Sequence, residues 1–266
     1  MGQLIVITSS QNSKIKLVRS LLGRAKERGE ANAFVVEGVR LVEEAAHSNW
    51  EFRFVLYDQT LNERGRSQVA GLKSRGVNVE MISESLMKSL SETETPQGLL
   101  AILEFSNLPI PKSPDFLLIP DQIRDPGNLG TLLRSAAATG VQTVLLPPET
   151  TDAFAPKVVR SGMGAQFRLP IHSMNWEEIK TQTNGVQIYL ADMDGQSCWE
   201  TDLRQPLALI VGGEAEGAST EARQLATQKI SIPMSGNVES LNAGVAGSVL
   251  MFEVVRQRSL TTKDSK

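Results

Sequence analysis

Hydrophobic residues in the first hundred positions follow two spacings. Between Asn12 and Arg28 they recur at steps of three and four, at Ile15, Val18, Leu22 and Ala25. This spacing places them on one side of a helix and predicts one helix over Asn12–Arg28. Apolar runs typical of strands cover residues 33–38, 52–58, 77–83 and 99–103, and a helical segment covers 39–48. The alternation predicts a small α/β domain with a largely parallel sheet.

The second half of the chain repeats this alternation more clearly. Five runs rich in Leu, Ile and Val are typical of strands covered on both faces; they occupy residues 116–120, 141–147, 187–192, 207–213 and 229–233. Helices are predicted over Leu129–Thr139, which Gly140 ends, and over Ala243–Arg258. The last helix has an apolar face of Val245, Val249, Phe252 and Val255. We expect a doubly wound α/β domain, whose ligands bind beyond the carboxyl ends of the strands.

A proline-rich segment separates the two halves. Residues 106–115 read SNLPIPKSPD, and their three prolines fix φ and remove backbone donors, as in a linker. We expect an N-terminal domain over 1–105, a linker over 106–114 and a C-terminal domain over 115–258. Residues 259–266 are polar, and we expect them to form a frayed tail.

Composition argues against several classes of function. The single cysteine, Cys198, allows no internal disulfide, which fits a reducing cytoplasm. The two histidines, His47 and His172, are far apart, so a zinc site and a Ser-His-Asp hydrolase are poorly supported and we expect no metal. No apolar run reaches the ~18 residues of a membrane span, and the first residues lack the charged start of a signal peptide. We expect a cytoplasmic protein that does not contact a membrane.

Charge is unevenly distributed along the chain. The net charge of −3 is not typical of a nucleic-acid-binding protein, but six basic residues against one acid give a local charge of +5 up to residue 28. The basic residues are Lys14, Lys16, Arg19, Arg24, Lys26 and Arg28. This stretch fits a solvated helix face and a phosphate-binding surface equally well, because electrostatic binding needs only a local basic surface.

Candidate chemistry lies in three loops that follow predicted strands. The first loop, Asp121–Gly130, leads into a helix. Gly127 and Asn128 suit a turn or a helix cap, and Arg134 follows six residues after Asn128. A plain cap beside a surface arginine explains this loop at least as well when it is taken alone.

The second loop, Val211–Gly217, has glycines that let a ligand approach the backbone closely. It is not a dinucleotide fingerprint, because Glu214 occupies the place of a required glycine. It is not a phosphate-binding loop either, because Ala218 replaces the required lysine. Its two carboxylates favour a cationic or neutral ligand, and a plain glycine turn is the alternative.

The third loop, Ile232–Asn242, opens the last predicted helix. Ser240 and Asn242 can cap that helix or direct hydrogen-bonding groups at a ligand, and the sequence leaves both roles open. Each of the three loops is weak support for a function by itself.

Together and in this order, the loops resemble the motifs of the SpoU/TrmH family of RNA 2′-O-ribose methyltransferases, within the SPOUT superfamily. Asn128 and Arg134 match the first motif. Gly212, Glu214 and Gly217 match the second, and Ile232 through Asn242 the third. Residues 159–170 also resemble the family's segment between the first two motifs.

A weaker resemblance extends into the first half of the chain. Asn12 with Lys14, Val36–Gly38 and Thr93–Gly98 resemble the substrate-binding domain often found ahead of the catalytic domain. That domain is similar to a small RNA-binding ribosomal protein. The resemblance therefore covers about residues 5–258.

The resemblance implies properties that the pattern of residues does not predict. It implies a trefoil knot in the C-terminal SPOUT domain, although knots are nearly absent from protein folds. It implies a homodimer with the site near the subunit interface, and S-adenosyl-L-methionine as cofactor. The implied cofactor-binding residues are Gly212, Gly213, Ile232, Met234 and Leu241. The implied catalytic residues are Arg134, Asn128, Glu214, Ser240 and Asn242.

The roles of the basic residues are narrower expectations. We expect Lys14, Lys16 and Arg24 to contact RNA phosphates. In this family the residue at Arg134 is sometimes described as a base. An arginine stays protonated, so stabilising developing charge on the ribose oxygen is the safer role, and both roles are open here.

Ribosomal RNA is the expected target, because a separate RNA-binding domain suggests a structured substrate. Transfer RNA is the alternative. Aromatic residues make up only 5% of the chain, which favours recognition of RNA backbone and shape over stacking on bases. Two other functions are alternatives: a non-catalytic RNA-binding protein of the same fold, and a nucleotide-dependent α/β enzyme using the glycine-rich loop.

Overall fold

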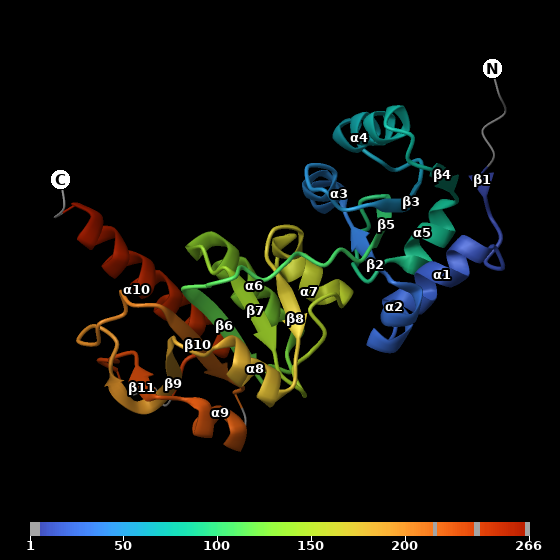
Figure 1. The fold of residues 1–266 in the computed structure, drawn as a ribbon. Helices are drawn as coiled ribbons and strands as arrows, with labels where there is room; N and C mark the ends of the chain where they lie inside the picture. Colours follow the sequence, from blue (N-terminus) through green and yellow to red (C-terminus); the bar gives the residue numbers. More distant parts are fainter. Residues whose placement is uncertain (1–5, 215–216, 237–239, 264–266) are drawn as a thin grey trace. The chain divides into compact units, whose positions relative to one another are not determined.

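The computed structural model describes residues 6–214, 217–236 and 240–263. The chain divides into two compact units (Figure 1). The N-terminal unit comprises Met1–Asn107 together with Phe154–Phe167, and the C-terminal unit comprises Leu108–Ala153 and Arg168–Lys266. The chain therefore passes between the units three times.

A five-stranded sheet forms the centre of the N-terminal unit, in the order β1-β4-β3-β5-β2. The strands are β1 (Val6–Ile7), β2 (Ala33–Glu37), β3 (Phe52–Tyr57), β4 (Val79–Ile82) and β5 (Leu99–Glu104). Around it lie α1 (Ser13–Leu22), α2 (Ala25–Ala31), α3 (Val39–Ala46), α4 (Glu63–Ser74), α5 (Glu84–Leu90), α7 (Pro156–Ser161) and the 3-10 helix η1 (Ala165–Phe167). The prediction of a largely parallel sheet is wrong, because β5 is antiparallel to both β2 and β3. An apolar run indicates that a strand is buried on both faces, but it carries no information about strand direction.

The predicted helix over Asn12–Arg28 is in fact two helices that meet near Gly23. Asn12 begins α1 by accepting a hydrogen bond from the Lys14 N–H. Arg28, on α2, turns back and donates to the carbonyl oxygens of Leu21 and Gly23 at 2.7 and 2.9 Å. These bonds satisfy carbonyls that the end of α1 leaves without partners. Apolar spacing continues across such a break and cannot reveal it.

Aromatic side chains from distant parts of the chain form one core of the N-terminal unit. Phe34 on β2 packs against Trp50 and Phe154, with ring centroids 5.4 and 5.0 Å apart. Phe105 and Phe154 are 4.8 Å apart in an edge-to-face arrangement, and Phe167 joins the same cluster. The segment Phe154–Phe167 thus supplies part of the hydrophobic core of a unit that is otherwise built from the first 107 residues.

The C-terminal unit has a six-stranded sheet in the order β11-β9-β10-β6-β7-β8, and every pair is parallel. Its strands are β6 (Phe116–Asp121), β7 (Thr143–Leu146), β8 (Ile171–Ser173), β9 (Gln187–Ser197), β10 (Leu207–Gly212) and β11 (Gln228–Ser231). Its helices are α6 (Pro126–Thr139), α8 (Trp176–Gln182), α9 (Thr220–Leu225) and α10 (Ala243–Lys263). The five predicted strands and the parallel α/β class are confirmed.

Helix α10 packs lengthwise against α6 (Figure 1). Ser135 and Ser248 share a hydrogen bond of 2.7 Å across this contact. A Cβ on Gly247 would lie 2.3 Å from a methyl group of Leu132, so a glycine lets the two helices approach closely. The helix also continues to Lys263 instead of ending at Arg258, so the first part of the expected frayed tail is helical. Within the described ranges, no helix combines the length and the apolar character that crossing a bilayer requires.

Candidate functional site

Three loops meet at the carboxyl edge of the C-terminal sheet because β6 and β10 are parallel neighbours. Asp121, at the end of β6, pairs in register with Gly212, at the end of β10. Asp125 caps α6 by accepting a hydrogen bond of 2.9 Å from the Asn128 N–H. This cap holds Asn128 in the first turn of α6, beside the loop that follows β10.

Asn128, Glu214 and Asn242 form one hydrogen-bonded group, called here the amide–carboxylate cluster. Glu214 Oε1 accepts from Asn128 Nδ2 at 2.9 Å, from Asn242 Nδ2 at 2.6 Å and from the Ala243 N–H at 3.2 Å. Asn242 Nδ2 also lies 2.8 Å from Asn128 Oδ1, while Asn242 Oδ1 accepts from the Val245 N–H. Asn242 therefore caps α10 and reaches the cluster at the same time.

A cavity of about 690 Å³ lies against this cluster. All five residues expected to bind the cofactor line it: Gly212, Gly213, Ile232, Met234 and Leu241. Glu214 and Ser240 line it as well. A smaller cavity of about 150 Å³ shares Gly213, Glu214, Gly217 and Ala243 with the larger one and adds Asn128 and Arg124. Glu214 thus stands at the wall common to both cavities.

Sequence reasoning missed part of the cavity lining, namely Asp192, Met193, Asp194 and Arg223. The strand was expected to end at residue 192, but β9 continues to Ser197 and carries polar residues along the cavity. Asp192 accepts from Arg223 at 3.0 Å and from Lys229 at 2.9 Å. Burial favours a higher pKa for Asp192. Hydrogen bonds from the Lys229 side chain, the Asp194 N–H and the Arg223 side chain outweigh burial and lower that pKa. The sequence signal that could have revealed this part of the lining is the alternation of Asp192 and Asp194 after an apolar run.

The glycines of the second loop serve the loop itself. A Cβ on Gly212 would lie 2.7 Å from the Ala218 nitrogen, and one on Gly213 would lie 2.6 Å from the Gln122 carbonyl oxygen. Gly213 and Gly217 exchange two backbone hydrogen bonds of 3.1 Å. We expected these glycines to let a ligand approach the backbone. The contacts show that the absence of side chains also lets the loop fold back on itself. Motif positions 215–216 and 237–239 lie outside the described residues.

Arg134 does not belong to the amide–carboxylate cluster. Its side chain is exposed on α6, and within the described part of the chain no hydrogen bond or ion pair reaches it. It lines neither of the two cavities. Of the five expected catalytic residues, Glu214 and Ser240 line the larger cavity. Asn128 and Asn242 are joined to Glu214 by hydrogen bonds, and Arg134 stays on the surface.

The expected RNA-binding residues differ in their surroundings. Lys14 is half-buried, forms a 2.6 Å ion pair with Glu80 and lies over the Phe54 ring. Lys16 and Arg24 are exposed. The two exposed side chains can meet a phosphate without breaking an internal ion pair, and Lys14 cannot.

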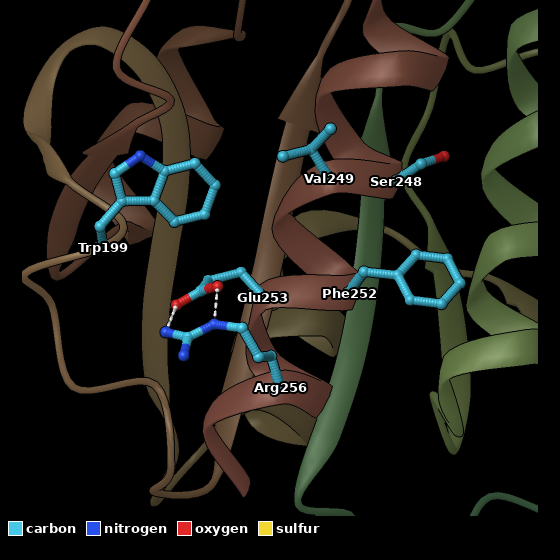
Figure 2. Close-up of a pocket in the computed structure, with 6 residues that line it drawn as sticks. All are labelled: Trp199, Ser248, Val249, Phe252, Glu253 and Arg256. Atoms are coloured by element: carbon cyan, nitrogen blue, oxygen red, sulfur yellow. Dashed lines mark hydrogen bonds and ion pairs between the residues drawn. The ribbon is translucent and has the colours of Figure 1, made fainter. Parts of the chain in front are cut away.

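A third hollow is a shallow groove of about 760 Å³ on the outer side of α10 (Figure 2). It is lined by Trp199, Ser248, Val249, Phe252, Glu253 and Arg256 and shares no lining residue with the other two cavities. In Figure 2 the Glu253–Arg256 ion pair lies between Trp199 and the helix. No group of three or more His, Cys, Asp or Glu side chains in the described ranges could hold a metal ion.

Comparisons with known proteins match both halves of the chain. The model of the SpoU rRNA Methylase family matches residues 115–252, and that of the MRM3-like substrate binding domain matches residues 12–101. The chain is 33% identical to the 23S rRNA (guanosine(2553)-2′-O)-methyltransferase RlmP of Bacillus subtilis, covering 93% of this chain and 98% of that protein. It is also 33% identical to a 23S rRNA (uridine(2479)-2′-O)-methyltransferase of Streptomyces viridochromogenes, covering 94% and 92%.

Solved structures agree with these matches. An AdoMet-bound rRNA methyltransferase from Sinorhizobium meliloti has a TM-score of 0.83 at 30% identity, covering 96% of this chain and 98% of that one. The SpoU methyltransferase AviRb from Streptomyces viridochromogenes, in complex with AdoMet, has a TM-score of 0.81 at 29% identity, covering 94% and 100%. Together with the site at the carboxyl edge of the parallel sheet, these matches show that the chain belongs to the SpoU rRNA methylase family.

Proposed function

We propose that this protein transfers a methyl group from S-adenosyl-L-methionine to a ribose 2′-hydroxyl of ribosomal RNA in the cytoplasm. The amide–carboxylate cluster at the wall of a cofactor-sized cavity carries the proposal. Asn128, Glu214 and Asn242 come from three separate loops, and all three are motif positions of the family. Two relatives that cover nearly the whole chain are named as 23S rRNA 2′-O-methyltransferases.

The larger cavity fits the proposed cofactor in size and chemistry. Its volume of about 690 Å³ falls within the usual ~300–1,000 Å³ of small-molecule sites. Met234 and Leu241 are each 37% exposed, which is typical of apolar side chains that a ligand covers. Asp192, Asp194 and Glu214 bring carboxylates to a ligand that carries positive charge. When bound, S-adenosyl-L-methionine supplies a methyl group already activated by its sulfonium.

The residues of the chain then have to orient the ribose. Carboxylate and amide groups bind sugar hydroxyls well, and three donors hold the Glu214 carboxylate in place before substrate arrives. Alignment of this kind is worth effective molarities of about 10⁵ M or more. The exposed guanidinium of Arg134 suits binding of the target's phosphate and stabilisation of charge on the ribose oxygen.

The N-terminal unit supports the choice of a large RNA substrate. Its match to a substrate-binding domain covers residues 12–101. Lys16 and Arg24 place positive charge on its surface, where RNA phosphates can be bound without specific base contacts. We propose that this unit holds the RNA and that the C-terminal unit modifies it. The expected limits of 1–105 and 115–258 follow the order of the chain, whereas Phe154–Phe167 packs into the N-terminal unit.

Mapping of 2′-O-methyl groups in total RNA tests the function directly. RNA from cells with and without the gene is compared, and the deletion strain is complemented with either the natural protein or Glu214→Ala. We expect one ribosomal position to lose its methyl group on deletion, to regain it with the natural protein and to stay unmodified with the variant. A lost methyl group in transfer RNA alone would contradict the proposed substrate, and an unchanged RNA would contradict the function.

We also propose that the protein is a homodimer assembled through the outer face of α10. The apolar face predicted for this helix points outward: Val245 is 47% and Phe252 is 53% exposed. Trp199, which lines the same groove as Phe252, is 48% exposed. Stable interfaces bury about 800 Å² on each partner, and exposed apolar side chains around a groove are typical of them (Figure 2). Gly244 and Gly247, on the inner side of the same helix, pack against Thr131 and Leu132 of the same chain.

Light scattering at micromolar concentration tests the dimer. We expect twice the mass of one chain for the natural protein and a single-chain mass for Phe252→Glu. Thr95→Glu adds the same charge to the exposed surface of the N-terminal unit and should leave the dimer intact. A natural protein with the mass of one chain would refute the proposal.

Two finer features of the fold are proposed with this function. The C-terminal unit would be threaded as a trefoil knot, supported by the contact of Glu214 with Asn242 and Ala243 at the start of α10. The N-terminal unit would share its fold with a small RNA-binding ribosomal protein. Tracing the chain in an experimental electron-density map, with the loops before α9 and α10 complete, decides the first point.

A further inference from the structure

Asp121 is a completely buried carboxylate at the end of β6. Its Oδ2 accepts a hydrogen bond of 2.6 Å from the Ser219 N–H. Its Oδ1 is also buried, and among the described residues it has no hydrogen-bond partner. Burial raises the pKa of this carboxyl group above its usual range. A buried carboxylate with one unsatisfied oxygen destabilises a fold, so stability alone is a poor reason for its presence.

Ser219 marks the point where the loop after β10 returns to the sheet. The loop leaves the strand at Gly212, which faces Asp121 in register, and ends at Ser219, the N-cap of α9. Asp121 therefore joins the end of the loop to the strand beside its beginning. The Gly213–Gly217 pair closes the same loop further out, with two hydrogen bonds of 3.1 Å.

The residues that these two sets of hydrogen bonds hold in place belong to the candidate site. Glu214 binds both asparagines of the amide–carboxylate cluster, and Gly217 and Ala218 line the larger cavity. A Cβ on Gly212 would meet the backbone of Ala218 at 2.7 Å, so the loop has almost no free space at its base. A small shift of Ser219 is therefore passed on to Ala218 and the cavity wall.

We infer that Asp121 is a positioning residue for the cofactor: by holding the Ser219 N–H it fixes Gly217 and Ala218 in the cavity wall and, through the Gly213–Gly217 pair, the backbone next to Glu214. This inference rests on the proposed function, since its ligand is S-adenosyl-L-methionine. Asp121 lines neither cavity, so it acts through the loop and does not touch the ligand itself.

Two variants of Ser219 separate the backbone hydrogen bond from the side chain. Ser219→Pro removes the N–H, and the φ of −63° at this position is one that proline adopts. Ser219→Ala keeps the N–H and removes the hydroxyl, which caps Ala222 and also interacts with the Asp121 carboxyl group. By calorimetry we expect the dissociation constant of S-adenosyl-L-methionine to rise about tenfold or more in Ser219→Pro, as for loss of a hydrogen bond to a charged group. Ser219→Ala should stay within about twofold of the natural protein.

A second pair of variants works at the other end of the bond and guards against misfolding of the proline variant. Asp121→Ala removes the acceptor, whereas Asp121→Asn keeps an oxygen that can accept from Ser219. Thermal unfolding of each variant is measured beside its cofactor affinity. We expect Asp121→Asn to recover most of the affinity that Asp121→Ala loses, even if both unfold at similar temperatures. A purely structural role predicts that affinity follows unfolding temperature instead.

The outcomes are distinct. A natural protein that does not bind S-adenosyl-L-methionine contradicts the proposed function. A natural protein that binds it, with folded Ser219→Pro and Asp121→Ala binding it equally well, overturns the role of Asp121 and leaves the function standing.

Discussion

Asn242 donates its side-chain amide to Glu214 over 2.6 Å, although 28 residues separate the two in the chain. The same amide nitrogen lies 2.8 Å from Asn128 Oδ1, so one side chain links the second and third loops to the first. The cluster thus connects three loops by hydrogen bonds, and each loop depends on the other two for its position. Its residues should be strongly coupled in any measurement of activity.

This coupling predicts that Asn242→Asp damages the enzyme more than Asn242→Ala. The aspartate would place a second carboxylate where the amide now donates to Glu214, and like charges at this distance repel. Single-turnover methylation of RNA should be slower in Asn242→Asp than in Asn242→Ala at pH 8. Equal rates for the two variants would show that the Glu214 contact is not used.

Replacement of Arg134 should affect chemistry and leave the fold intact. The side chain is exposed and has no partner among the described residues, so alanine should change the free energy of unfolding by less than about 0.5 kcal/mol. Loss of a group that stabilises developing charge costs about 10²–10³ in rate. We expect Arg134→Ala to bind S-adenosyl-L-methionine normally and to methylate RNA at least about a hundredfold more slowly. Arg134→Lys should recover little, because a point charge does not reproduce the planar guanidinium.

That experiment also decides between two interpretations of the sequence motif. A folded Arg134→Ala protein that methylates RNA at the natural rate would make this residue an ordinary surface arginine.

Replacement of glycine by alanine should have opposite effects on the free energy of unfolding at two positions in helices. A Cβ at Gly247 would overlap a methyl group of buried Leu132, and overpacking of this kind costs about 1–3 kcal/mol. A Cβ at Gly71, on α4, would meet nothing within 4 Å. Chemical denaturation should show that Gly247→Ala lowers the free energy of unfolding, while Gly71→Ala raises it by about 0.4–1 kcal/mol. A stabilising Gly247→Ala would mean that α6 and α10 are not as closely packed as described.

Cys198 should make the fold sensitive to alkaline pH. Burial, with a smaller effect of the Glu253 charge, raises the pKa of this thiol from 9.0 to about 11. Because the folded-state pKa is the higher one, the thiol's contribution to stability is complete below pH 9 and is lost as the pH rises through about 11. The free energy of unfolding should fall over this range more steeply in the natural protein than in Cys198→Ala. Thiol reagents at pH 8 should react with the folded protein far more slowly than with the unfolded chain.

Charge reversal in the N-terminal unit should weaken RNA binding without affecting the cofactor. Lys16 and Arg24 are exposed, so Lys16→Glu with Arg24→Glu removes charges that RNA phosphates can reach. Binding of RNA should weaken, and its dependence on salt should become shallower. Lys14→Glu is a poor test, because it would also break the ion pair with Glu80 and destabilise α1. An unaltered salt dependence in the double variant would show that the two residues form a solvated face.

The parts of this structure that the sequence predicts are those governed by local pattern. Apolar runs located all five expected strands of the C-terminal sheet, since strands covered on both faces are apolar throughout. Parallel strands end at one edge, so loops after β6 and β10 had to be neighbours. The family resemblance predicted which side chains of those loops form the site, and the structure brings three of them together, namely Asn128, Glu214 and Asn242.

The features that the sequence did not predict depend on contacts between distant segments. The direction of β5 and the break at Gly23 are decided by neighbours in space, not by spacing along the chain. The Asp192 side of the cavity was missed because β9 continues past its apolar part. Asp121 resembled an ordinary strand end, since only the folded chain brings it to Ser219.

The core of the N-terminal unit has a consequence for how the protein is made. Phe154 and Phe167 belong to that core, yet they are synthesised after the first strands of the C-terminal unit. A ribosome adds ~5–20 residues per second, so the nascent N-terminal unit waits on the order of seconds with part of its aromatic core unfilled. The N-terminal unit therefore begins to fold before its last segment has been made, and a chain cut after Asn107 would expose apolar surface that the complete protein covers.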